Sequence, residues 1–86
     1  MRRDPAEYEG RQMDLVYIAG ALEEAQKLEA LLDQAGFDYV IEVEQYRSGV
    51  IFASVRAGAF FYVEPESATR CRQVLSQAGY SAQGEV

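Results

Sequence analysis

Apolar residues recur along two stretches of the chain at the spacing of an amphipathic helix. In residues 21–35 a leucine or alanine returns every three or four positions, which makes one stripe on a helix of 3.6 residues per turn. Residues 66–80 repeat the pattern of residues 23–37 and share its ending, Gln-Ala-Gly before an aromatic residue. Gly36 and Gly79 suit the left-handed position that follows a helix. Pro65 suits the first helical position, where its missing N–H costs nothing. The pattern predicts two helices related by an internal repeat.

Short strand-like runs flank both helices. Residues 15–18 are apolar on both faces, as expected for a central strand. Residues 39–44 alternate apolar side chains with polar ones that include Glu42 and Glu44, which is typical of a half-exposed strand near the sheet edge. Residues 50–55 and 59–63 are two further strand segments, with 47–49 as a hairpin turn and 56–58 as a bulge or second tight turn. Residues 80–83 have weak strand character and would form a short edge strand.

The order of these elements spells strand, helix, strand twice. Two such units with right-handed crossovers, joined by a hairpin, predict an α+β fold, the ferredoxin-like βαββαβ sandwich. Its antiparallel sheet carries both helices on one face. Residues 1–13 mix charges with Pro5 and Gly10 without a sustained period, so we expect a mobile N-terminal tail or a short helical turn that docks late. Residues 14–86 would form the ferredoxin-like domain.

The repeat also assigns side chains to the two faces of the sheet. It maps Tyr17 onto Phe60, so the two should share a face, and a tyrosine hydroxyl favours the side with water or a partner. An aromatic patch left open in this way suits dimerisation, a ligand or stacked bases; the alternative is that the N-terminal segment or an extra strand covers it. We expect Val16, Ile18, Phe61 and Val63 to face the helices, and Tyr17, Phe60 and Tyr62 to face away.

Size and charge narrow the classes of function. Eighty-six residues make one small domain, which a dimer interface would help to stabilise. No apolar run approaches the ~20 residues of a membrane span, and residues 1–13 lack the apolar core of a secretory signal, so we expect a cytoplasmic protein. The net charge of −6 argues against a nucleic-acid surface, which needs clustered Lys and Arg.

The chain offers few groups for catalysis or metal binding. It has no histidine, the commonest general base and zinc ligand. Cys71 is alone and falls on the apolar side of a helix, so it is a packing residue. Glu42 and Glu44 are too few for a calcium site and read as a solvated strand face. We therefore predict no catalytic residues, no metal and no cofactor. Arg47 and Arg56, in turns beside the aromatic patch, are the candidates for contacting an anionic ligand.

Two resemblances bear on function. Val16-Tyr17-Ile18 is similar to the first-strand signature of RNA-recognition motifs, whereas residues 56–63 keep only part of the third-strand signature. From residue 15 to about residue 75 the chain resembles a small bacterial family described as signal-transducing proteins of unknown function, which shares a ferredoxin-like fold with PII-like regulators. The resemblance rests on Tyr17-Ile-Ala, Glu24-Ala, Leu28, Leu31-Leu32, Ala35-Gly36 and Phe60-Phe-Tyr-Val-Glu-Pro-Glu66. It implies the fold but no catalytic residue.

These observations predict a non-enzymatic regulatory module that binds a small molecule or a protein. We expect it to form a homodimer through the open aromatic face (Tyr17, Phe60 and Tyr62) or through an edge strand. Two alternatives stay open: a binder of single-stranded nucleic acid that resembles an RNA-recognition motif, and a small dimeric ferredoxin-like enzyme with its cavity between sheet and helices.

Overall fold

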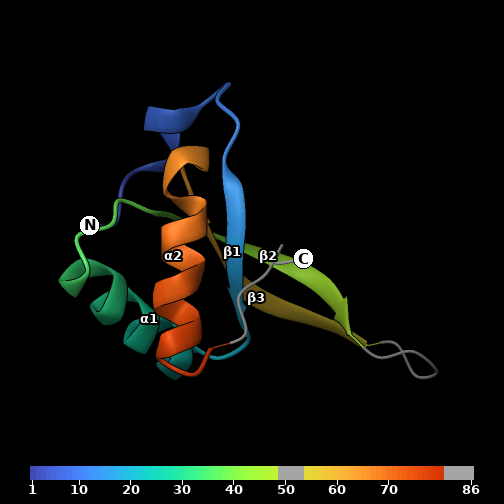
Figure 1. The fold of residues 1–86 in the computed structure, drawn as a ribbon. Helices are drawn as coiled ribbons and strands as arrows, with labels where there is room; N and C mark the ends of the chain where they lie inside the picture. The colour runs from blue at the N-terminus through green and yellow to red at the C-terminus, as the bar shows by residue number, and fades with distance from the viewer. Residues whose placement is uncertain (49–53, 81–86) are drawn as a thin grey trace.

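Two helices pack on one face of a three-stranded antiparallel sheet in the computed structural model (Figure 1). It describes residues 1–48 and 54–80, and their side chains except at 46–48 and 54–56. The sheet order is β1-β3-β2, so β3 lies in the middle. The elements are η1 (a 3-10 helix, Pro5–Tyr8), β1 (Asp14–Ala19), α1 (Leu22–Gln34), β2 (Val40–Ser48), β3 (Ser54–Val63) and α2 (Pro65–Gln77). The prediction of an α+β fold is confirmed.

Both helices begin and end close to where the apolar spacing predicts. Glycine follows each helix in the left-handed region, with φ of 79° at Gly36 and 92° at Gly79, where a side chain would be strained. The amide of the next residue, Phe37 or Tyr80, donates back into the last turn at 3.0 Å and 2.9 Å. Pro65 is the first residue of α2, as its missing N–H allows. The repeated ending therefore builds the same helix stop twice.

The core lies between the helices and the sheet. Both helices contribute side chains to it, and the middle strand contributes Phe61 and Val63, which are fully buried. The Tyr39 ring stacks on Phe61 with centroids 5.9 Å apart, and its hydroxyl reaches the core boundary, where it donates to Asp33 at 3.0 Å. The helical members of the core are Ala25, Leu28, Leu32, Ala68, Cys71 and Leu75. The predicted helix stripes therefore face the sheet.

A β-bulge in β1 overturns part of the predicted face assignment. Leu15 pairs with Tyr62 and Tyr17 with Phe61, so Val16 is the extra residue. Both Val16 and Tyr17 then lie on the helix side, since Val16 is fully buried and Tyr17 packs against the core. The predicted place of Tyr17 on the open face is wrong, and so is that of Ile18 on the helix side, because Ile18 pairs with Phe60. The guanidinium of Arg72 donates to the Leu15 carbonyl beside the bulge at 3.2 Å.

The hairpin arm is longer and more regular than the sequence suggests. β2 pairs with β3 without interruption from Val40↔Tyr62 to Ser48↔Ser54, so residues 56–58 form neither a bulge nor a turn. Residues 47 and 48 lie in β2, and the predicted turn at 47–49 is wrong at these positions. The predicted strand segment 50–55 falls partly in residues 49–53, outside the described part, as does the edge strand expected at 80–83 apart from Tyr80, which is not in a strand.

The N-terminal segment, residues 1–13, contacts the sheet. Its first residues run parallel to the start of β2, where the Arg3 amide donates to the Tyr39 carbonyl at 2.7 Å and the Tyr39 amide donates to the Met1 carbonyl at 3.2 Å. The helix η1 follows, capped by the Asp4 carboxylate, and lies against β2. The predicted short helical turn is therefore present, while the mobility of the segment stays a prediction. None of the described helices is both long enough and apolar enough to cross a membrane.

Truncation of a core leucine tests this packing. We expect Leu32→Ala, which removes a fully buried side chain from α1, to lower the free energy of unfolding by about 2–5 kcal/mol. Leu22→Ala, in the same helix at a position that is 76% exposed, should cost less than about 1 kcal/mol. Urea unfolding followed by circular dichroism measures both. Equal losses in the two variants would contradict the assignment of the helix faces.

Candidate functional site

The helix-free face of the sheet, which we call the open face, carries half-exposed aromatic side chains from β3. Phe60 and Tyr62 alternate with the buried Phe61 and Val63, so they point away from the helices. On the neighbouring strand Val40 pairs with Tyr62, and Glu42 pairs with Phe60. Two of the three predicted aromatics therefore lie together on the open face, and Tyr17 does not.

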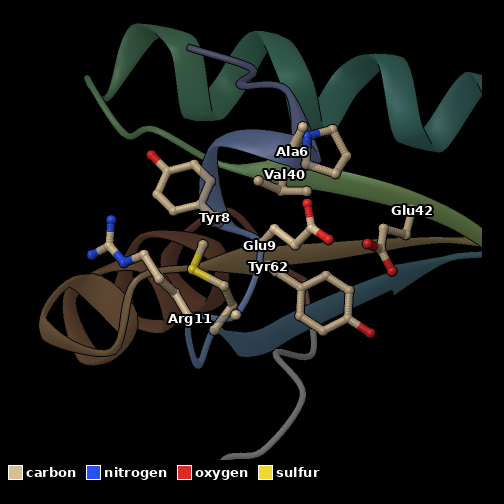
Figure 2. Close-up of a pocket in the computed structure, with 10 residues that line it drawn as sticks. Ala6, Tyr8, Glu9, Arg11, Val40, Glu42 and Tyr62 are labelled. Atoms are coloured by element: carbon tan, nitrogen blue, oxygen red, sulfur yellow. The ribbon is translucent and has the colours of Figure 1, made fainter.

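The N-terminal segment turns one end of this face into a pocket. Val40 is only 4% exposed although it lies outside the core cluster, because residues of the N-terminal segment cover it. The pocket is open to solvent on one side, and its volume of about 580 Å³ is within the range of small-molecule sites. Figure 2 shows Tyr8 and Tyr62 on opposite sides of this volume. The lining residues of this open-face pocket are Pro5, Ala6, Tyr8, Glu9, Gly10, Arg11, Met13, Val40, Glu42 and Tyr62.

The charges of the pocket are distributed unequally. Arg11 is engaged within the protein: its Nη2 donates to the Glu64 carboxylate at 3.3 Å, and its guanidinium lies 5.2 Å from the centre of the Tyr8 ring. Glu9 and Glu42 have no cationic partner among the side chains that the structure describes. Both extend into the same space above the Tyr62 ring (Figure 2). Among the described side chains, the pocket therefore has two carboxylates without a cationic partner and one cation that is paired with a carboxylate.

The hydroxyl of Tyr62 is partly buried and lies near two carboxylates of β2. Burial raises the pKa of Tyr62, and the carboxylates of Glu44 and Glu42 raise it further because they oppose a tyrosinate. The phenol is therefore neutral near neutral pH and available as a hydrogen-bond donor. Because the carboxylates of Glu42 and Glu44 disfavour a negative charge at the Tyr62 ring, they favour a positively charged group there.

Tyr17 has a structural role on the other side of the sheet. Its hydroxyl donates to the Glu24 carboxylate in α1 at 3.3 Å, and its ring meets Tyr80 edge to face, with centroids 5.5 Å apart. Burial raises the pKa of Tyr17, and the neighbouring charge of Glu24 adds to the effect. Tyr17 therefore ties β1 to α1 and to the end of α2, and the open face has Ile18 in its place.

The predicted anion contacts, Arg47 and Arg56, lie in strands rather than in turns. Their backbones are opposite Val55 and Tyr46, in the arm of the β2–β3 hairpin that extends beyond the helices (Figure 1). Their side chains lie outside the part that the structure describes. The cation that the structure does place at the open-face pocket is Arg11, from the N-terminal segment.

The sequence offered coverage of the aromatic patch by the N-terminal segment only as an alternative, and it did not identify the residues of 5–13 that form the pocket wall. No periodicity marks this segment, and its side chains act through their position over β2 and β3 rather than through a motif. The local signals were Pro5, which begins η1 after the Asp4 cap, and Gly10, whose φ of 77° turns the chain back towards β1. These signals indicate a folded turn, but they carry no information about what the turn covers.

A second hollow lies on the helix side of the sheet, at the start of α1. Val43 of β2 is 74% exposed and Leu22 is 76% exposed, and between them the surface is floored by small residues. This α1–β2 groove has a volume of about 200 Å³ and is almost entirely apolar. Its lining consists of Ala19, Gly20, Ala21, Leu22, Ala25, Val43, Ala57, Gly58 and Ala59. Leu22 and Val43 are, with Met1, the large apolar side chains that are exposed among the described residues.

The described part of the chain has few groups suited to metal binding or to nucleophilic catalysis. There, no group of three or more Asp, Glu, Cys or His side chains is arranged to hold a metal ion. Cys71 is fully buried in α2 against the core, and this burial raises the pKa of its thiol to about 11. A protonated buried thiol is a poor nucleophile. Cys71 is therefore a packing residue, as its place in the helix stripe predicts.

The buried thiol should make the protein less stable in alkali. In the unfolded chain a cysteine loses its proton near pH ~8.5. Because the folded pKa is raised, the stabilisation is complete below that pH and is lost as the pH rises towards about 11. We expect the free energy of unfolding, measured in urea, to fall across this window. In Cys71→Ala the baseline is lower but the decline across the window should be shallower; an unchanged slope would show that the thiol does not contribute.

Comparison of the chain with models of protein families, with curated proteins and with solved structures finds no match. The assignment of a function therefore depends on the geometry of the open-face pocket and of the α1–β2 groove.

Proposed function

We propose that this chain is a non-enzymatic binding module whose ligand site is the open-face pocket. The position of this pocket supports the proposal. It has a volume of about 580 Å³ and lies between the N-terminal segment and the sheet face that no helix covers. Its walls combine apolar surface from Tyr8, Met13 and Val40 with a small number of polar groups, as in small-molecule sites. The ligand is a small molecule or one side chain of a partner protein.

The wider assignment follows the sequence. We propose that the domain is ferredoxin-like, since the order β1-β3-β2 with both helices on one face matches three of the four strands of that fold. The fourth strand, which the sequence predicts at residues 80–83, falls outside the described residues except for Tyr80, which is not in a strand. The resemblance to the bacterial family described as signal-transducing proteins fits a regulatory module in the cytoplasm.

The two alternative functions have less support. Base stacking of the RNA-recognition type needs an aromatic residue of the first strand on the open face, and Tyr17 faces α1 instead. An enzyme with its cavity between sheet and helices needs an acid–base group there. Among the described residues, the buried side chains with a polar atom are Cys71, which lies among apolar side chains, and Tyr39, whose pKa is raised mainly by burial.

Filling the pocket tests the proposed site. Ala6 is an exposed residue of η1 that lines the pocket, so Ala6→Trp should occupy its volume without disturbing the sheet. A small-molecule library screened by NMR should contain ligands that shift the amide signals of Val40, Glu42 and Tyr62. We expect Ala6→Trp to weaken such ligands by at least about tenfold, which is ~1.4 kcal/mol.

The matched control is Ala30→Trp, which adds the same side chain at an exposed position of α1 away from the pocket. It should leave binding unchanged. The proposed function fails if the library shifts none of the three signals, or if ligands that shift them bind Ala6→Trp as tightly as the parent protein.

We further propose that the protein self-associates through the edge of β2 and the α1–β2 groove. In the described sheet β2 pairs only with β3, so its other edge is open beyond Tyr39, and Val43 projects from it beside the exposed Leu22. Glu42 and Glu44 oppose a symmetric pairing of two β2 strands centred on Val43, since it brings like charges together. Salt, which screens this repulsion, should therefore strengthen the dimer.

Sedimentation equilibrium at low and high salt tests self-association. Val43→Glu should shift the protein towards monomer, whereas Phe60→Glu, on the open face, should leave the equilibrium unchanged. The reverse result would move the interface to the open face, the other surface that the sequence suggests. A protein that stays monomeric at high concentration and high salt would contradict both.

A further inference from the structure

We infer that the open-face pocket takes an organic cation, an alkylammonium group that Tyr62 contacts through its ring and that Glu9 and Glu42 attract through their carboxylates. The inference rests on the proposed function, because it names the chemical class of the ligand for the same pocket.

The charges of the pocket lining favour a cation. Arg11 is the cation of the lining, and Glu64 already neutralises it through a contact of 3.3 Å. Glu9 and Glu42 enter the same space from opposite walls, one from the N-terminal segment and one from β2, and neither meets a cation among the described side chains (Figure 2). The space between them is therefore favourable for a positive group and unfavourable for an anion.

The pocket also presents an aromatic surface that suits a cation. A cation is attracted to the face of a tyrosine ring at about 0.5–1 kcal/mol in an exposed site and more when water is excluded. The protein already shows this interaction at the pocket wall, where the Arg11 guanidinium lies 5.2 Å from the Tyr8 ring centre. Tyr62 offers a second ring to the pocket, and no aromatic or cation–π partner is described for it. A ligand cation would extend the arrangement that Arg11 begins.

Carboxylates of β2 and apolar side chains surround the Tyr62 ring. Burial is the first reason that the pKa of its phenol is raised, and the charges of Glu44 and Glu42 are the next. These carboxylates act on the ring from β2, so the negative field reaches the place where the ligand would lie. The apolar side chains of Met13 and Val40 complete a wall that suits the methyl or methylene groups of an alkylammonium ion.

Three isosteric probes separate charge from shape. Choline carries the cation, 3,3-dimethyl-1-butanol is its neutral analogue, and 3,3-dimethylbutanoate carries an anion on the same apolar group. NMR titration at low ionic strength, followed at the amides of Val40, Glu42 and Tyr62, should show choline binding about tenfold more tightly than the alcohol. The carboxylate should bind more weakly than either.

Variants identify the groups responsible. Glu42→Gln should weaken choline binding by about five- to tenfold and leave the alcohol unaffected, since it removes one charge from an exposed position. Glu23→Gln is the matched control, because it removes the same charge from the exposed first turn of α1 on the other side of the sheet. Tyr62→Leu keeps an apolar side chain without a ring and should reduce the preference for choline over the alcohol.

Each contrary outcome has a definite meaning. If the alcohol binds as tightly as choline, the cation is not recognised, and the pocket remains a site for neutral ligands. If the carboxylate binds most tightly, Arg11 is the recognising group and the inference is wrong. If choline leaves the three amides unchanged, or Glu23→Gln weakens it as much as Glu42→Gln, the inference is also wrong. In all these cases the proposed function stands or falls separately, by the Ala6→Trp comparison with library ligands.

Discussion

The alternation of side chains along β3 is the constraint on which the rest of the structure depends. This strand is hydrogen-bonded to β1 on one side and to β2 on the other, so it cannot shift by one residue without exchanging its two faces. Phe61 and Val63 fill the layer between sheet and helices, and this places Phe60 and Tyr62 on the open face. The same four consecutive residues, 60–63, therefore contribute to both the core and the candidate site. A shift of β3 by one residue would take Phe61 and Val63 out of the core and Phe60 and Tyr62 off the open face.

The bulge at Val16 decides which residue of β1 joins that site. A regular β1 opposite β3 would alternate its side chains, and Tyr17 would then lie on the face opposite to Val16. The extra residue keeps Val16 in the core and rotates Tyr17 to the same side, where its hydroxyl meets Glu24 and its ring meets Tyr80. Ile18 takes the place beside Phe60. The open face is therefore less aromatic on β1 than the internal repeat suggests, and its polar character comes from β2 and the N-terminal segment.

The sequence predicted the elements that depend on residues close together in the chain. The leucine and alanine spacing, Pro65 and the glycines at 36 and 79 act within a few residues of chain, and both helices form where they predict. The faces of β3 also followed from its own alternation. The bulge did not, because it depends on matching β1 to a partner strand distant in sequence. The walls of the pocket did not either, since Tyr8 and Arg11 gain their role only when residues 1–13 pack over β2 and β3.

Ligand binding in the open-face pocket would depend on the contact of the N-terminal segment with the sheet. At one end the Arg3 amide bonds to the Tyr39 carbonyl, and at the other Arg11 contacts Glu64 across the surface. An exposed ion pair such as Arg11–Glu64 contributes only about 0–1 kcal/mol. A ligand that contacts both walls binds only the docked state, and it therefore stabilises that state in proportion to its own affinity. If the pocket binds the proposed ligand, a partner that displaced residues 1–13 from β2 would remove Glu9 and Tyr8 from the pocket and would weaken binding by the same linkage. The segment that completes the site is thus also the element through which binding at the open face and pairing along β2 would influence each other.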